Sequence, residues 1–497
     1  MSHRSHESKS PGQRLNRRRF LGAMAAGAGA AAAGRIARGA ENAGNRLNVL
    51  LVISDQQHAG MMSCTGNPHL KTPALDRLAE TGVRFERAYP SNPVCLPSRF
   101  SMMTGHMPSE LGIRENAGIP SGGQVPEAML QQAMGHVFRR AGYETLYGGK
   151  THWPRGMKVD TIGFAPLTPD QRDGLADACV EFLREKHEKP WLLVASFINP
   201  HDICYMAIDA HAQANREAAF APKNTAERQR LAEALRMPAG VAEQEFFAKH
   251  CPPLPANHEI PPLEPECVAK LVTMRAFRAY VRQHWSAQDW RRHRWAYCRL
   301  TERVDGQIGR VLDALRDAGL ENDTLVVFVS DHGDMDASHR MEHKTVLYEE
   351  ACRVPFIVRR PGVTKAGLVD RTHLVSAGLD LLPTLCDFAG IEPPAGLRGR
   401  SVRPLAEGVA PDDWRDDLAV ESQIGRMVRT GRYKYNLYED GARREQLIDL
   451  NGDPGEMDNL AERPECKAVL NDHRRRLCRW VDETGDPVAK PYLVRPS

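Results

Sequence analysis

The sequence predicts an α/β protein in which a mainly parallel, mixed central sheet is flanked by helices. Apolar runs of strand length alternate with helical patterns along most of the chain, which is typical of parallel strands joined by crossover connections. The run at residues 48–54 is continuous and β-rich, as expected of a strand that is buried on both faces. Beyond residue 415 the pattern changes to short alternating segments and one terminal helix, which predicts a smaller C-terminal α+β subdomain with an antiparallel sheet.

The predicted elements of the larger domain have local support. Strands are expected at residues 48–54, 144–148, 191–198 and 324–330. A helix at 72–81 has Thr72 as its N-cap and Pro73 at its first helical position. A longer helix, from about residue 295 to 318, carries apolar residues at helical spacing and meets a stop signal at Gly319.

Two segments interrupt this pattern and suggest the domain boundaries. Residues 202–288 contain proline clusters and short polar helices, as in an irregular insertion at the rim of a domain. A linker rich in proline and acidic residues near 404–414 separates a catalytic domain at 45–405 from the subdomain at 415–497. Within that subdomain, strand-like segments at 426–436 and 446–450 precede a helix at 462–483.

The first 40 residues have the features of a targeting segment. Residues 17–21 (RRRFL) fit the twin-arginine pattern, and the uncharged run from Phe20 to Gly34 is too short and too weakly apolar to span a membrane. A disordered basic terminus is the alternative, but it does not account for an apolar run directly after paired arginines. We therefore expect export by the twin-arginine translocase to the periplasm or the exterior, cleavage near Ala37 to Ala40, and a mature chain that does not span the membrane.

The composition excludes some functions and leaves others open. A net charge of +3, from 66 basic and 63 acidic residues, gives no overall field that points to nucleic acid. Basic clusters at 291–294 and 474–476 are more typical of solvated helix faces than of ligand sites. The 11 cysteines show no disulfide framework, and folding before export weakens the expectation of disulfides, so no pairing is predicted.

Polar side chains follow each of the four predicted parallel strands. The strand ends run into Asp55-Gln56, Lys150-Thr151-His152, Asn199-Pro200-His201 and Asp331-His332. In open α/β sheets the carboxyl ends of parallel strands meet at one edge, where ligands bind. Packing alone does not explain four such endings, so the sequence predicts a functional site there.

The donor groups at these strand ends suit a divalent cation. Asp55, Gln56, Asp331 and His332 offer carboxylates, an amide oxygen and an imidazole. Oxygen-rich sites of this kind bind Ca²⁺ or Mg²⁺, and the imidazole also admits Mn²⁺. The alternative is that each aspartate caps the helix that follows its strand. The Cys95 segment described next favours the metal site.

The run Cys95-Leu96-Pro97-Ser98-Arg99, followed by Thr104-Gly105, predicts that Cys95 lies at the start of a helix. Proline suits the first turn, and the residues after it are compatible with a helix. Free N–H groups and the helix dipole favour an anion at such a terminus. A lone cysteine is more often an inert core residue, but the fixed context of Pro97, Arg99 and Thr104-Gly105 argues against that here.

These segments resemble the type I, formylglycine-dependent sulfatases of the alkaline phosphatase superfamily. The Cys95 run is similar to the family signature C-x-P-S-R, and residues 142–152, 330–334, 342–355 and 447–461 are similar to other family motifs. The resemblance covers residues 47 to about 465, except the insertion. It implies an alkaline-phosphatase-like fold and a nucleophile made by a formylglycine-generating maturation enzyme, which oxidises Cys95 to 3-oxoalanine.

The resemblance also implies a role for each matching residue. Position 95 would bind the metal and, as an aldehyde hydrate, attack sulfur. The other implied catalytic residues are Arg99, which holds the hydrate; Lys150, His201 and Lys344, which neutralise the sulfate oxygens; Lys344 or His201, which protonates the leaving oxygen; and His152, which deprotonates the second hydroxyl. Arg114 and Asn116, with His201 and Lys344, are expected to contact the substrate.

Two departures from the family pattern affect the expected metal and substrate. Many members have aspartate where this chain has Gln56, and asparagine where it has His332. Both changes alter the oxygen donors, which lowers the expected Ca²⁺ affinity or admits Mn²⁺. The leading hypothesis is a sulfatase acting on a sulfated carbohydrate. The alternatives are a phosphonate monoester or phosphodiester hydrolase of the same superfamily, and an inactive sulfated-glycan-binding protein with an unmodified thiol at Cys95.

Overall fold

The computed structural model describes residues 46–118, 124–215 and 225–496. The predicted twin-arginine segment and its cleavage site lie outside these residues. Leu47–Ser497 belongs to one compact unit. Among the described residues, no helix combines the length and the apolar character that a membrane crossing requires.

A mixed eight-stranded sheet forms the centre of this unit, in the order β5-β4-β6-β1-β7-β8-β2-β9. The four predicted strands are its adjacent middle members: β4 (Glu144–Gly149), β6 (Trp191–Pro200), β1 (Asn48–Asp55) and β7 (Thr324–Ser330). They pair in parallel, so their carboxyl ends lie at one edge. β8 (Phe356–Arg359) runs antiparallel to its neighbours β7 and β2 (Val83–Phe85), which makes the sheet mixed. The predicted fold class is confirmed.

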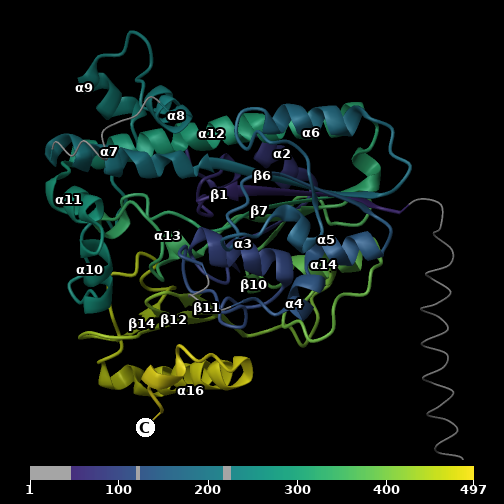
Figure 1. Cartoon of the computed structure of the whole chain (residues 1–497). Helices are drawn as coiled ribbons and strands as arrows, with labels where there is room; N and C mark the ends of the chain where they lie inside the picture. Colours follow the sequence, from purple (N-terminus) through teal and green to yellow (C-terminus); the bar gives the residue numbers. More distant parts are fainter. Residues whose placement is uncertain (1–45, 119–123, 216–224, 497) are drawn as a thin grey trace, which may run out of the picture. The chain divides into compact units, whose positions relative to one another are not determined.

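Helices cover both faces of the sheet (Figure 1). One face packs against α2 (Pro73–Thr81), α6 (Leu175–Arg184) and α12 (Ala287–Asp317), and the other against α3 (Cys95–Thr104), α5 (Met134–Arg140) and α14 (Leu381–Ala389). Leu50 and Val52 of β1 belong to the first core, whereas Val49 and Leu51 belong to the second. Burial on both faces explains why β1 is a continuous apolar run.

One helix starts earlier than the sequence predicts, and another starts as predicted but is capped by a different residue. α12 begins at Ala287, before the predicted position near 295, because Ser286 and Asp289 form a capping box. In α2, Thr72 occupies the N-cap position as predicted, but its side chain makes no capping hydrogen bond. The carboxylate of Asp305 on α12 accepts instead from the N–H groups of Ala74 and Leu75, at 3.1 and 2.9 Å. A contact between distant segments therefore replaces the local cap.

The insertion is more helical than expected. Its helices are α7 (Cys204–Asn215), α8 (Ala226–Ala234), α9 (Glu243–Glu245), α10 (Glu266–Thr273) and α11 (Ala276–His284). α8 packs on α12, and α11 packs on α7 and α10. Short helices such as these are stabilised mainly by packing against other helices. The apolar periodicity within each segment is therefore only a weak sequence signal for a helix.

The C-terminal part contains the predicted antiparallel sheet and helix. Its strands are β11 (Asp417–Ser422), β12 (Gly425–Thr430), β13 (Tyr433–Tyr438) and β14 (Glu445–Asp449), followed by α16 (Lys467–Thr484). The inner face of α16, through Leu477 and Val481, packs on Val428 and Leu437 of the sheet. The remaining elements are β3 (Ala88–Tyr89), α4 (Glu127–Gln131), β5 (Ala165–Pro166), α13 (Glu349–Cys352), β9 (Leu368–Asp370), β10 (Val375–Ser376) and α15 (Arg403–Ala406), with short 3₁₀ and π turns.

Candidate active site

Cys95 is the first residue of α3 and lies at the predicted sheet edge. Its side chain is 1% exposed. Val94 precedes it in extended backbone as the N-cap, and the N–H of Leu96 donates to Asn116 Oδ1 at 3.1 Å. The position of Cys95 at a helix N-terminus, inferred from Pro97, is therefore present in the structure.

Side chains from three other segments surround the Cys95 sulfur. His332 Nε2 lies 3.0 Å from Sγ, Lys344 Nζ 3.2 Å and Lys150 Nζ 3.7 Å. Burial alone would raise the pKa of this thiol, but the nearby charges of these residues hold it well below its usual value of 9.0. In the unmodified chain, position 95 is therefore a site for negative charge.

A buried group of potential metal ligands includes this sulfur. Asp55, Cys95, Asp331 and His332 offer donor atoms that all lie within 4.8 Å of one another. His332 Nδ1 lies 2.8 Å from the carbonyl oxygen of Gly333, which assigns the ring proton to Nδ1 and leaves Nε2 free to coordinate. Two carboxylates, an imidazole and position 95 thus fit a divalent cation, as predicted from the strand ends.

Arg99 holds the two carboxylates of this group in place. The fully buried guanidinium donates to Asp55 Oδ2 at 2.8 Å and to Asp331 Oδ2 at 2.7 Å. It also donates to Ser196 Oγ at 2.6 Å and to the carbonyl oxygen of Lys150 at 3.1 Å. The structure thus gives Arg99 a positioning function within the donor group, in addition to the implied contact with the hydrate.

Gln56 adopts an unusual backbone conformation at the end of β1. Its φ of 67° lies in the left-handed region, which costs a non-glycine residue about 1–3 kcal/mol. Two hydrogen bonds hold it there: its N–H donates to Asp331 Oδ1 at 3.0 Å, and its carbonyl accepts from Tyr297 Oη at 2.5 Å. Its side-chain oxygen lies 2.5 Å from Lys344 Nζ, so this predicted metal ligand also contacts the cationic side of the site.

Lys150 and His152 enter the site from the turn after β4. Gly149 has a φ of 90°, and a Cβ there would lie 2.0 Å from the carbonyl oxygen of Ser196, so only glycine fits this close strand contact. Lys150 Nζ then reaches Asp55 Oδ2 at 2.5 Å. His152, with a φ of 55°, lies within hydrogen-bonding reach of the Cys95 sulfur. Its Nδ1 is buried and has no hydrogen-bond partner among the described residues, so it is available to a ligand.

His201 also lies within hydrogen-bonding reach of the Cys95 sulfur. Burial, together with the positive charges of Lys150 and Lys344, lowers the pKa of His201 to about 4. In the ligand-free site at neutral pH, His201 is therefore a neutral imidazole, and the two lysines carry the positive charge.

The two residues predicted to contact the substrate occupy different positions. Asn116 is tied to the start of α3 through its hydrogen bond with Leu96. Arg114 forms an ion pair with Glu439 and hydrogen-bonds to the carbonyl oxygen of Gln423 in the C-terminal part. Asn116 is thus next to Cys95, whereas Arg114 is engaged with the C-terminal part.

Three further residues support the site and had no predicted role. Ser196 binds Arg99, as described above. Asp334 accepts from Gln56 Nε2 at 2.6 Å, and Cys204 Sγ lies 3.1 Å from the same nitrogen. Burial raises the pKa of Asp334 well above its usual value. Asp334 lies in the segment Ser-Asp-His-Gly-Asp at residues 330–334, which gave it no role in the sequence analysis. Its hydrogen bond with Gln56 shows that it helps to position that side chain.

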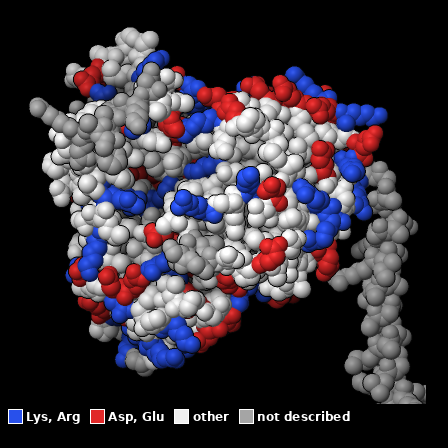
Figure 2. Space-filling view, in the orientation of Figure 1, with Lys and Arg blue, Asp and Glu red and all other residues white. Residues whose placement is uncertain are grey.

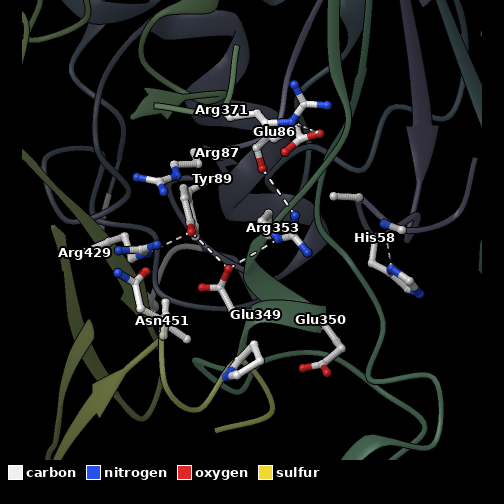
Figure 3. A pocket seen from close by; sticks show the side chains of 14 residues that line it. His58, Glu86, Arg87, Tyr89, Glu349, Glu350, Arg353, Arg371, Arg429 and Asn451 are labelled. Atoms are coloured by element: carbon white, nitrogen blue, oxygen red, sulfur yellow. Dashed lines mark hydrogen bonds and ion pairs between the residues drawn. The ribbon is translucent and has the colours of Figure 1, made fainter. Parts of the chain in front are cut away.

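A separate cavity of about 490 Å³ lies between α13 and the C-terminal sheet (Figure 3). Its charged lining comprises Glu86, Arg87, Glu349, Glu350, Arg353, Arg371 and Arg429. Many of these groups contact one another: the Tyr89 hydroxyl lies between Arg429 and Glu349, which also pairs with Arg353 at 3.3 Å. With no cysteine or lysine in its lining, this cavity has the character of a structural ion-pair network and is not the candidate active site.

The fold and the site together define a hydrolase of the alkaline phosphatase superfamily. The model of the sulfatase family matches residues 47–391, and that of the C-terminal part of N-sulphoglucosamine sulphohydrolase matches residues 337–483. The chain therefore belongs to the sulfatase family, and it is a sulfuric ester hydrolase.

Individual relatives cover nearly the whole chain. Delta 4,5-hexuronate-2-O-sulfatase of Bacteroides thetaiotaomicron is 30% identical, over 90% of this chain and 91% of the relative. The solved structure of a 2-O GAG sulfatase superposes with a TM-score of 0.74 at 28% identity, covering 89% of this chain and 93% of the other. The phosphonate monoester hydrolase of Agrobacterium radiobacter shares the fold, with a TM-score of 0.66 at 22% identity, covering 88% of this chain and 96% of the other.

Proposed function

We propose that the protein hydrolyses a sulfate ester of a sulfated carbohydrate, with formylglycine at position 95 and a divalent metal ion. The observation that carries the proposal is the position of Cys95. It begins a helix, belongs to a buried metal-ligand group and lies beside two lysines. The carbohydrate part is supported by the names of the relatives, a hexuronate-2-O-sulfatase and a 2-O GAG sulfatase.

Asp55, Asp331, His332 and position 95 would hold the metal, with Gln56 as a further ligand. Ca²⁺ fits the carboxylates best, and the imidazole also admits Mg²⁺ or Mn²⁺. When bound, the cation supplies Lewis-acid polarisation of the ester, and the formylglycine hydrate supplies the nucleophilic oxygen.

The side chains around position 95 would carry charge and protons. Lys150 and Lys344 lie 3.7 and 3.2 Å from the Cys95 sulfur, where they would neutralise the sulfate oxygens. One hydroxyl oxygen of the hydrate would bond to sulfur and lose its proton as the S–O bond to the alcohol breaks, and the leaving oxygen would take a proton from Lys344 or His201. Burial and the positive charges of Lys150 and Lys344 lower the pKa of His201. The negative charge of a bound sulfate ester opposes this effect, so sulfate binding favours protonation of His201. His152 then removes the proton of the second hydroxyl at position 95, sulfate departs and the aldehyde returns.

The cellular context forms part of the proposal. The twin-arginine translocase would export the chain to the periplasm or the exterior, after a formylglycine-generating enzyme has acted on Cys95 in the cytoplasm. The catalytic domain would span residues 45–405, and residues 415–497 would form a subdomain that borders the substrate through Arg114. The ion pair with Glu439 joins Arg114 to that part of the chain.

A comparison of ester classes tests the proposed function. We expect the matured protein to hydrolyse an aryl sulfate with a kcat/KM at least about 100-fold above that for a matched aryl phosphodiester or phosphonate monoester. All three esters carry one negative charge, so the expected preference comes from geometry. A sulfate ester presents three non-bridging oxygens to Lys150, Lys344 and the metal, whereas the other two esters present two and a second organic substituent. Faster turnover of the phosphodiester would favour the phosphonate monoester or phosphodiester hydrolase. Absence of turnover, with an intact thiol at position 95, would favour the sulfated-glycan-binding protein.

The cationic clamp can be tested by removing its members singly. Lys344→Ala is expected to lower kcat/KM for an activated aryl sulfate about 100- to 1,000-fold, because the variant lacks the buried positive charge that neutralises the sulfate oxygens. We expect a smaller loss for His201→Ala, since an activated leaving group needs little protonation. The exposed Lys365→Ala is the control. Near-normal rates in both site variants would show that the clamp is assigned wrongly.

A further inference from the structure

Three neighbouring polar side chains beside the lysine clamp lack hydrogen-bond partners at buried atoms. Within the part of the chain that the structure describes, these atoms are Arg278 Nε, Glu342 Oε1 and both ring nitrogens of His343. Glu342 is 1% exposed and His343 is 3% exposed. An unsatisfied buried polar group costs about 1–3 kcal/mol, and more when charged. Glu342 Oε1 and His343 Nδ1 face each other at 3.7 Å, which is beyond hydrogen-bond distance, so a hydrogen-bonding partner for these groups is missing.

The backbone explains why these groups lie together. Glu342 and His343 directly precede Lys344, the clamp residue that contacts Cys95. Arg278 comes from α11 of the insertion, one turn before Arg282, which donates to the carbonyl oxygen of His339 at 3.3 Å. Because positions four apart share a helix face, this bond directs Arg278 towards the segment that carries Glu342.

A second contact brings the insertion to the metal side of the site. α11 packs on α7, whose first residue, Cys204, lies 3.1 Å from Gln56 Nε2. Glu342 is the charge that most strongly attracts Arg278, and Arg278 in turn lowers the pKa of buried His343. Figure 2 shows Lys and Arg side chains in a band across this face, from the side of α11 towards α3. A substrate held by Lys344 would therefore meet further positive charge in the direction of α11.

We propose that Arg278, Glu342 and His343 form a subsite for the uronic acid ring of an acidic sulfated sugar, in which Arg278 binds the carboxylate. The planar guanidinium matches the two oxygens of a carboxylate. Glu342 accepts a hydrogen bond from a ring hydroxyl, and the neutral imidazole of His343 donates to one. Lys344 continues to neutralise the oxygens of the sulfate group that is cleaved. This subsite names the substrate class of the proposed sulfatase and rests on that function.

A pair of substrates that differ only in the carboxylate tests the subsite. The probes are a sulfated uronic acid disaccharide and its carboxyl-reduced analogue, which keeps the sulfate. Wild type is expected to prefer the uronate in kcat/KM by about 10- to 100-fold, the range for a charged hydrogen bond. Arg278→Ala should remove that preference while leaving the rate on the reduced analogue within about 3-fold. Arg275→Ala, at the exposed N-cap position that precedes α11, is the control. An equal loss on both substrates would overturn the subsite.

A binding measurement separates this proposal from the proposed function. With catalysis removed by Cys95→Ala, calorimetry should give a Kd for the uronate that Arg278→Ala raises about 10- to 100-fold, and a Kd for the reduced analogue that it leaves unchanged. If that difference is found but wild type cuts neither compound, the subsite stands and the sulfatase assignment fails. If the two compounds bind wild-type chain equally, the subsite is wrong whatever the activity. A disaccharide with a second sulfate in place of the carboxylate, bound equally well, would also overturn carboxylate recognition.

Discussion

Replacing Cys95 by serine or alanine is expected to lower sulfate ester hydrolysis by about 10⁴-fold or more, the scale of losing a covalent nucleophile. Serine is the sharper test, since it keeps a hydroxyl of similar size at the N-terminus of α3. An unoxidised serine carries a single hydroxyl, so it lacks the second hydroxyl whose deprotonation releases sulfate, and mass spectrometry of the variant verifies that the serine is unmodified. The activity of each purified variant on an aryl sulfate would be measured beside wild type produced with the maturation enzyme.

Two further measurements make this expectation decisive. Mass spectrometry of the peptide that contains position 95 should show the aldehyde in active wild-type protein and an intact thiol in protein made without maturation. Cys466→Ala changes a half-buried cysteine of the C-terminal part and should retain full activity. If unmatured protein or Cys95→Ser hydrolyses the sulfate at the wild-type rate, the formylglycine proposal is wrong.

The central sheet was the most predictable part of the fold. β1, β6 and β7 are largely apolar runs buried on both faces, so their type and extent are visible in the sequence, whereas β4 is shorter and partly exposed. The short strands β2 and β9, of 3 residues each, carry no such signal, since neighbouring strands define them. The capping of α2 by Asp305 could not be predicted either, because the carboxylate and the helix start lie about 230 positions apart in the sequence.

The candidate site was predictable to the extent that its residues follow strands. Asp55, Lys150, His201 and Asp331 lie at adjacent strand ends, and the topology rule for parallel sheets brings them together. Cys95 does not follow a strand but begins a helix on one face of the sheet, so only the sequence motif around it could identify it as a site residue. Arg278 gave no signal at all: its segment reads as a short polar helix, and only the packing of α11 on α7 brings it towards the site.

Replacing Arg99 is expected to cause the largest loss of stability among the changes considered. Arg99→Ala should lower the free energy of unfolding by about 3–5 kcal/mol, because it leaves buried charges without their partner. Asp55 and Asp331 would then face each other in a fully buried site, where Lys150 still pairs with Asp55 but the arginine that joins the two carboxylates is gone. Arg99→Lys keeps the charge, but a single ammonium cannot span both carboxylates and Ser196, so we expect an intermediate loss.

Denaturant unfolding, with and without Ca²⁺, distinguishes this positioning role from simple packing. If Arg99 compensates the same carboxylates that hold the metal, a divalent cation should restore more stability to Arg99→Ala than it adds to wild type, because it replaces the missing charge. A loss that Ca²⁺ leaves unchanged would mean that the variant suffers mainly from the cavity. Arg475→Ala, at an exposed ion pair on α16, should change stability by less than about 0.5 kcal/mol and serves as the control. Wild-type unfolding midpoints for both Arg99 variants would contradict the proposal that this buried arginine organises the metal-ligand group.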